Sequence, residues 1–177
     1  MAFRAKTLFI GILFSFLLAM ETSCGVYSLT GTTITAETLS IQTFFNDANN
    51  GPANLAVIFT DKLRDYYQQN TSLSQVTYDG ELQIEGAVTG YRLTPVAPSA
   101  AANEQINDQA SLTRLTITVQ VDYIDLEDEE QNFEKKTFSF YADFDNDQGL
   151  TAVEEQLINE IYDQIILDIF NTTVANW

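Results

Sequence analysis

One stretch near the middle of the chain alternates apolar and polar residues more clearly than any other. The apolar positions are Leu115, Ile117, Val119 and Val121, and the polar positions between them are Thr116, Thr118 and Gln120. Successive side chains of a β-strand point to opposite faces of the sheet. The pattern therefore predicts a strand with one face in a core and the other exposed. Such a strand needs partner strands and a covering layer.

Other segments supply candidate partner strands. The predicted ranges are 38–45, 73–78, 82–90 and 133–144. In the first of these, Leu39, Ile41, Thr43 and Phe45 would share one face. Gly86 and Gly90 predict a bulge or a close backbone contact in the third segment. The small and polar residues 95–110 predict a loop.

Two segments have the apolar spacing of amphipathic helices. The first spans residues 52–70, with Pro52 in its first turn. The second follows Thr151, which forms a predicted capping box with Glu154 and precedes a stripe of Leu and Ile residues. The order of elements predicts an α+β fold, with two helices packed on one face of a mixed, mostly antiparallel sheet of four to five strands.

The composition excludes several functional classes. The 177 residues include no histidine, so catalytic pairs that need an imidazole are excluded. With 8 basic and 25 acidic residues, the net charge is −17, which makes nucleic acid an unfavourable partner. The acidic run at residues 127–130 is interpreted as a charged hairpin tip, because catalytic carboxylate pairs need a cleft. We expect no enzymatic activity and no cofactor.

The N-terminus has the pattern of an export signal. Arg4 and Lys6 precede the apolar run at residues 8–18, which is shorter than the roughly 20 residues of a membrane span. The sole cysteine, Cys24, follows directly after Ser23. We predict a lipoprotein signal peptide at residues 1–23, a tether at 24–36 and a single domain at 37–177.

Cys24 is the predicted lipid attachment site, and multiple acyl chains would hold the domain on a membrane. Lipoprotein signals usually have an aliphatic residue three positions before the cysteine, where this chain has Glu21. The alternative is an ordinary secreted protein, cleaved earlier and left with a free thiol. Cleavage before Cys24 removes two basic residues and one acidic residue, so the remaining chain is one charge unit more negative.

Several segments together resemble the LptE family of lipopolysaccharide-assembly lipoproteins, in the version found in Bacteroidetes-type Gram-negative bacteria. The resemblance depends on their order and spacing over essentially the whole chain after Ser23. The segments are CGVYSLTG, TLSIQTFFN, FTDKLRDYYQQNTSL, ELQIEGAVTGY, RLTITVQVDY and AVEEQLINEIYDQIILDIFNTTVANW.

The resemblance implies a lipid-anchored protein of the outer membrane that faces the periplasm. Its implied partner is an LptD-type β-barrel, with which it would help insert lipopolysaccharide into the outer membrane. Enteric members are thought to contact lipopolysaccharide through basic residues, of which this chain has few. The acidity favours a role in building the barrel over binding the anionic lipid. Two other hypotheses are an accessory lipoprotein of a lipid-trafficking ABC transporter and a lipid-anchored glycan-binding module.

Arg92 and Arg114 flank the loop region at the ends of two strands that we expect to pair. They could form a small cationic lip for lipopolysaccharide phosphates or for acidic loops of a barrel partner. The alternative is that both are solvated arginines that balance nearby acids.

Residues 143–154 partly match a calcium-binding loop. The candidate ligands are Asp143, Asp145, Asp147 and Glu154. A calcium loop needs glycine at its sixth position, but here Gln148 occupies it and Gly149 follows. The alternative is an acidic turn that starts the last helix.

Overall fold

The computed structural model describes residues 35–96 and 112–174. Residues 1–34, which include the predicted signal peptide, Cys24 and most of the predicted tether, lie outside this part. Most of the predicted loop at 95–110 also lies outside it. Every structural statement below concerns the described residues.

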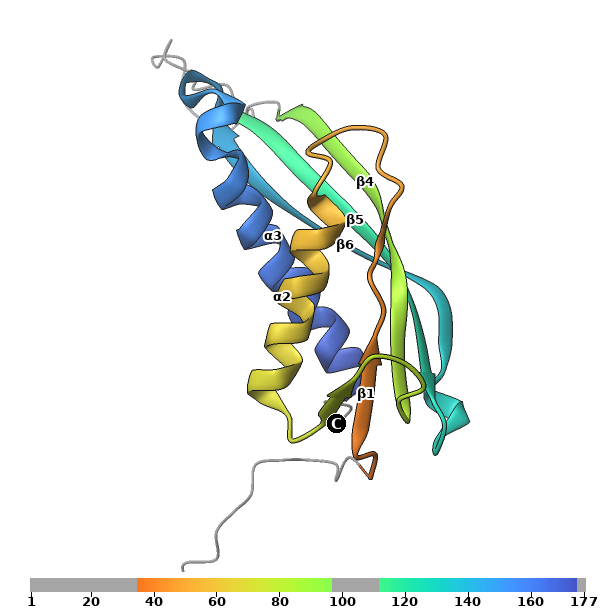
Figure 1. Ribbon diagram of the computed structural model, residues 1–177. Coiled ribbons are helices and arrows are strands. Elements are labelled where there is room, and N and C mark those ends of the chain that lie inside the picture. The colour runs from red at the N-terminus through yellow and green to blue at the C-terminus, as the bar shows by residue number, and fades with distance from the viewer. Residues whose placement is uncertain (1–34, 97–111, 175–177) are drawn as a thin grey trace, which may run out of the picture. The chain divides into compact units, whose positions relative to one another are not determined.

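Six strands form one mixed sheet (Figure 1). They are β1 Thr38–Ile41, β2 Phe45–Asn46, β3 Ser74–Val76, β4 Leu82–Val96, β5 Leu112–Asp125 and β6 Phe133–Asp145. The strand order is β3-β1-β4-β5-β6, with β2 also beside β4. The long strands β4, β5 and β6 pair antiparallel, whereas the short strands β1, β2 and β3 pair parallel. The predicted α+β class is confirmed, and the sheet has six strands because the predicted first strand is split in two.

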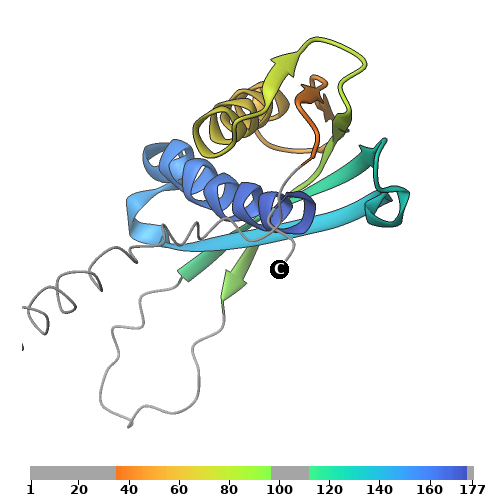
Figure 2. The ribbon, with the colours of Figure 1, turned by 90° about the horizontal axis from the view of Figure 1, so that it is seen from below.

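Two helices cover one face of this sheet, as predicted (Figures 1 and 2). The helix α2 spans Leu55–Asn70 and α3 spans Leu150–Thr173. The short turns η1 Glu129–Gln131 and η2 Asn146–Gln148 join the last strands and α3. Neither helix within the described residues has the length and apolar character that crossing a membrane requires.

The alternating strand lies at the centre of the core. Its apolar side chains are fully buried under the helices, and its polar side chains lie on the other face, which confirms the predicted pattern. The buried positions are Leu115, Ile117, Val119 and Val121. The facing stripe of α3 is formed by Leu157, Ile161, Ile165 and Ile169. Each such side chain contributes about 1.5–3 kcal/mol when fully buried.

Two buried hydroxyl contacts fasten the helices to each other. The Tyr162 hydroxyl of α3 donates to the carbonyl oxygen of Leu55 at 3.1 Å, where α2 begins. At the other end of α2, the Tyr67 hydroxyl lies 2.5 Å from Thr173 Oγ1. Burial raises the pKa of both tyrosines, so both stay neutral and keep their protons for hydrogen bonding.

The glycines of β4 mark a bulge and a close contact. The register with β5 shifts between Val88 and Gly90, which confirms the predicted bulge. At Gly86, a Cβ would lie 2.1 Å from the carbonyl oxygen of Gln120 in β5. Only glycine allows this approach of the two backbones.

The prediction that Phe45 shares a face with Leu39 and Ile41 is wrong. The strand breaks after Ile41, and Phe44 is buried instead, while Phe45 is 72% exposed. The backbone N–H of Phe44 donates to Thr60 Oγ1 of α2 at 3.0 Å, and its ring meets Phe59 edge to face. Contact with α2 therefore sets the orientation of this segment.

Both predicted helix starts are wrong in detail. The helix α2 begins at Leu55, because Pro52 lies in a preceding turn whose carbonyl accepts from the Leu55 N–H at 3.3 Å. The helix α3 begins after Gly149 with no side-chain cap. The predicted capping box does not form, because the N-cap is Gly149 and Thr151 already lies inside the helix. The Glu154 carboxylate accepts a hydrogen bond from Tyr91 instead.

We expect Gly86→Ala to destabilise the fold by about 1–3 kcal/mol, as overpacking of a core does. The added methyl group would collide with the β5 backbone, which cannot move without disturbing the sheet. Urea denaturation of the purified protein measures this change. Glu85→Ala, an exposed neighbour, is the control and should stay within about 0.5 kcal/mol of the parent. Equal stability of the two variants would contradict the close contact.

Candidate functional site

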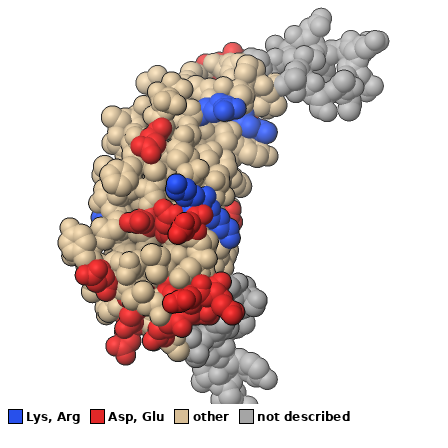
Figure 3. Space-filling model, turned by 90° about the vertical axis from the view of Figure 1, so that its right-hand side faces the viewer, with Lys and Arg blue, Asp and Glu red and all other residues tan. Residues whose placement is uncertain are grey.

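The face of β4, β5 and β6 that turns away from the helices is polar, and we call it the open face. Strand alternation places hydroxyl, amide and charged side chains there. They include Arg92, Thr94, Arg114, Thr116, Thr118, Gln120, Ser139, Tyr141 and Asp143. On the side shown in Figure 3, basic side chains lie in the upper and middle parts, and acidic side chains are concentrated in the lower part.

Arg114 is held on the open face by a neighbour on β6. Its guanidinium donates to both carboxylate oxygens of Asp143, at 2.7 Å from Nε and 2.8 Å from Nη2. It also stacks over the Tyr141 ring at 3.6 Å from the centroid. The hydrogen bonds between the two side chains lower the pKa of Asp143 and raise the pKa of Arg114. The positive charge of Arg114 is therefore already balanced.

Arg92 lies on the same face and is not balanced. Its backbone pairs with Thr116 of β5, two residues from Arg114. Within the part of the chain that the structure describes, Arg92 has no ion pair and no hydrogen bond from its side chain. The structure thus brings both predicted arginines to one face, but only Arg92 has a guanidinium available to a partner.

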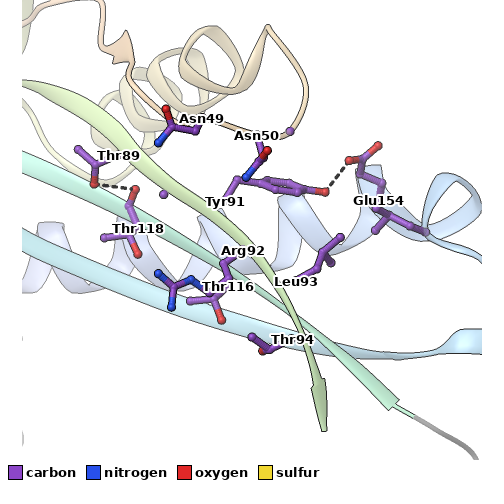
Figure 4. A pocket seen from close by; sticks show the side chains of 13 residues that line it. Asn49, Asn50, Thr89, Tyr91, Arg92, Leu93, Thr94, Thr116, Thr118 and Glu154 are labelled. Atoms are coloured by element: carbon purple, nitrogen blue, oxygen red, sulfur yellow. Dashed lines mark hydrogen bonds between the residues drawn. The ribbon is translucent and has the colours of Figure 1, made fainter.

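A groove runs along β4 beside Arg92 (Figure 4). It has a volume of about 1020 Å³, and we call it the edge groove. The loop at residues 49–51, the strand residues 89–94 and the start of α3 line it.

On the helix side of the edge groove, Tyr91 connects β4 to α3. Its hydroxyl donates to Glu154 Oε1 at 2.5 Å. Burial, followed by the hydrogen bond to Glu154, raises the pKa of Tyr91. At Gly51, where φ is +91°, a Cβ would lie 2.7 Å from the Tyr91 ring. Glycine therefore lets the 49–51 loop approach the Tyr91 ring. Tyr91 is thus held in place by this loop and by Glu154 of α3.

The candidate calcium ligands do not converge. Asp143 faces Arg114 on the open face, whereas Glu154 faces Tyr91 on the helix side. Asp147 lies in η2 and is exposed. Among the described residues, no group of three or more acidic or cysteine side chains is arranged to hold a metal ion. Residues 145–149 form an acidic turn that precedes α3.

Sequence reasoning missed the edge groove. The predicted strand at 82–90 ended too early, because β4 continues through Thr94 and Pro95 to Val96. Pro95 could have indicated this edge, because a proline inside a strand is tolerated where the N–H of that position would face solvent at a sheet edge. The contact between Tyr91 and Glu154 joins residues that are 63 positions apart, and no local pattern encodes it.

The comparison with protein families identifies the domain. The family model described as "LptE: Lipopolysaccharide-assembly" matches residues 36–173, which is nearly all of the described part. The chain belongs to the LptE family. The resemblance seen in the sequence is therefore confirmed. The family acts in lipopolysaccharide assembly at the cell envelope and is not enzymatic.

Several solved structures are similar to this chain over most of its length. A minor lipoprotein from Acinetobacter baumannii is 16% identical, with 80% of this chain and 94% of that chain covered and a TM-score of 0.47. A hypothetical protein from Chlamydia trachomatis is 10% identical, with 80% and 99% covered and a TM-score of 0.49. An uncharacterised lipoprotein from Nitrosomonas europaea is 12% identical, with 82% and 90% covered and a TM-score of 0.48.

A comparison with curated proteins gives no significant match. The three TM-scores are below 0.5, so the family assignment rests on the family model alone.

We expect Asp143→Asn to lower the melting temperature near pH 7, because it removes the charge partner of Arg114. The folded state holds the pKa of Asp143 below its usual value, so the pair stabilises the fold above the unfolded pKa, which is about 3.9. This contribution is lost as the pH falls through the folded pKa. The difference between parent and variant should therefore shrink toward zero in acid.

Thermal melts from pH 7 down to about pH 2 measure this dependence, because the contribution is lost only below the unfolded pKa. Asp147→Asn, which changes an exposed aspartate four residues further along, is the matched control and should show a smaller effect at pH 7. A difference for Asp143→Asn that is constant across this range would contradict the role of the ion pair.

Proposed function

We propose that this protein is a lipid-anchored component of the outer membrane that partners an LptD-type β-barrel in the insertion of lipopolysaccharide. The observation that carries this proposal is the family match over residues 36–173. It spans both helices and all six strands, so the whole domain, and not a local motif, supports the assignment.

The charge of the chain favours contact with a protein over contact with the lipid. Lipopolysaccharide carries anionic groups, and a chain with a net charge of −17 repels them over distances near the Debye length. Arg114, one of the two candidate contacts, is paired with Asp143. We therefore propose that the domain supports the barrel and has no catalytic role. Arg92 is the stronger of the two candidate contact residues.

We propose that Cys24 anchors the protein and that the domain faces the periplasm. The cysteine follows the apolar run at residues 8–18 at the distance expected for lipoprotein processing. Only about a dozen residues separate it from the start of the family match at residue 36. An anchor at this position would keep the domain close to the membrane that holds its partner.

Affinity purification of the tagged full-length protein from outer membranes tests the partnership. We expect an LptD-type barrel to be recovered in stoichiometric amount. Recovery of a permease complex would favour the ABC-transporter hypothesis, and recovery only on a glycan resin would favour a glycan-binding module. Either result would contradict our proposal. Depletion of the protein should also reduce lipopolysaccharide at the cell surface, and normal surface display would count against the proposed function.

Substitution of the proposed lipid attachment site tests the anchor. We expect Cys24→Ala to lose the acyl modification seen by mass spectrometry and to reduce the membrane-bound fraction, because no thiol remains to be acylated. Ser23→Ala keeps a small residue before the cysteine and is the matched control, which should remain acylated. An unacylated Cys24 in the parent protein would contradict the anchor.

A further inference from the structure

The outer edge of β4 is only partly covered. The short strand β2 pairs with β4 at Ala87 and Val88, and β1 pairs with its first residues. Beyond Val88, β4 continues for eight residues to Val96. Within the described residues, no strand pairs with this outer side. We call residues 89–96 the free edge. At about 3.4 Å per residue they span about 27 Å, enough for a typical strand.

The backbone groups of the free edge that face outward can be assigned from the ladder. The carbonyl of Thr118 faces β4, where it accepts a hydrogen bond from Thr89 Oγ1 at 3.5 Å. Alternate residues of an antiparallel pair point to opposite sides. Leu115 and Ile117 therefore point to β6, and their β4 partners, Leu93 and Tyr91, direct their N–H and C=O groups outward.

Pro95 fits this assignment. Pro95 pairs with Thr113, and the backbone groups of Thr113 point to β6 as those of Leu115 do. The backbone nitrogen of Pro95 therefore faces outward. A proline at such a position costs no hydrogen bond to β5. Among the described residues of the free edge, the donors that point outward are therefore the N–H groups of Tyr91 and Leu93.

The free edge is open to an extended chain because the edge groove runs along it. Thr89, Tyr91, Leu93 and Thr94 all line the groove, which has a volume of about 1020 Å³. Leu93 is 41% exposed and offers an apolar contact on the helix side. A segment laid in this groove would meet unpaired backbone groups and one exposed apolar side chain.

Charge indicates the chemistry of the segment. Arg92 lies between Tyr91 and Leu93 and lines the same groove, with its side chain on the open face. It is the one arginine of the described residues that has no acidic or hydrogen-bonding partner. A residue on an added strand opposite Arg92 would have its Cβ about 4.5–5.5 Å from that of Arg92. A carboxylate at that position would balance the charge.

Two terminal strands of the sheet also have free edges. The strand β3 has only three residues, and the edge of β6 is less suited to pairing. Its register with β5 shifts between Val121 and Tyr123, and Lys135 there has φ of +50°. Bulges, prolines and lysines all discourage edge pairing. The β4 edge has a bulge between Val88 and Gly90 and a proline at Pro95, and the outward positions Tyr91 and Leu93 lie between them. Lys135 and Lys136 are both present at this end of β6. The β4 edge has no lysine and lies in a groove.

We propose that the free edge of β4 binds an extended segment of the barrel partner by strand addition. The segment pairs with the backbone of Tyr91 and Leu93 and places an acidic side chain opposite Arg92. This inference rests on the proposed function for the identity of the partner. The mode of binding rests on the free backbone groups, the groove and the unpaired arginine.

Proline substitution tests the backbone pairing. We expect Leu93→Pro to reduce capture of the barrel by at least about tenfold, because it removes an outward N–H and inserts a ring into the interface. Leu93 makes no backbone hydrogen bond to β5, so the variant should keep the parent's far-ultraviolet circular dichroism. Leu93→Ala keeps the N–H and should retain more capture than Leu93→Pro. Thr137→Pro places a proline at an outward position of the β6 edge and should leave capture unchanged.

Charge reversal tests the acidic side chain. We expect Arg92→Glu to weaken capture by about tenfold and to make capture improve with added salt, because salt screens the new repulsion, while Arg92→Lys retains most of the affinity. Lys135→Glu is the matched control, because it reverses a charge at the β6 edge. A photo-crosslinking residue at Thr94 should attach to a segment of the barrel that contains Asp or Glu.

The outcomes separate the two proposals. If the parent protein captures no barrel, the proposed function fails, and with it the partner assigned here. If the parent and a folded Leu93→Pro variant capture the barrel equally, the strand-addition inference fails alone. A dimer of the purified protein that Leu93→Pro dissociates would overturn the inference in favour of a second copy. Binding of lipopolysaccharide vesicles that Arg92→Glu abolishes and Leu93→Pro does not change would overturn it in favour of an anionic headgroup.

Discussion

The burial of one face of β5 against α3 is the contact on which the rest of this structure depends. Both antiparallel neighbours of β5 are held in register by it, because a shift by one residue would expose the apolar side chains. The helix α2 joins this core through α3, where Tyr162 bonds to Leu55 and Tyr67 meets Thr173. The short strands β1 and β2 then pair with β4, and β3 pairs with β1.

The same alternation that fills the core also composes the open face. Residues between the buried positions of β5 must point away from the helices, so Arg114 and the threonines appear there together. On this face the ion pair between Arg114 and Asp143 leaves Arg92 as the arginine with free donors. Among the described residues, an acidic domain thus presents one unbalanced arginine beside a groove, which suits a specific contact better than a broad attraction to anionic lipid.

Unequal strand lengths create the feature most relevant to function. The strand β4 has 15 residues, whereas β1 and β2 have four and two. Among the described strands, none therefore pairs with the outer side of the far half of β4. Proteins usually protect such edges, as this chain does on β6 with a bulge and lysines. The far half of β4 has a bulge and Pro95 but no lysine, and it lies beside a groove that Gly51 and Glu154 line. This arrangement supports the proposed role in binding a partner segment.

The sequence by itself determined the α+β class, the two helices on one sheet face, the alternating core strand and the bulge in β4. These depend on local periodicity, and a period of 2 or 3.6 residues is visible in a single sequence. The family resemblance also came from the sequence, through the order of its segments. The tertiary structure decided which residues meet across long distances. It placed Phe44 in the core in place of Phe45, gave Glu154 to Tyr91 and not to a cap, and paired Arg114 but not Arg92. These outcomes depend on contacts between elements far apart in the chain, and no local pattern of residues encodes such contacts.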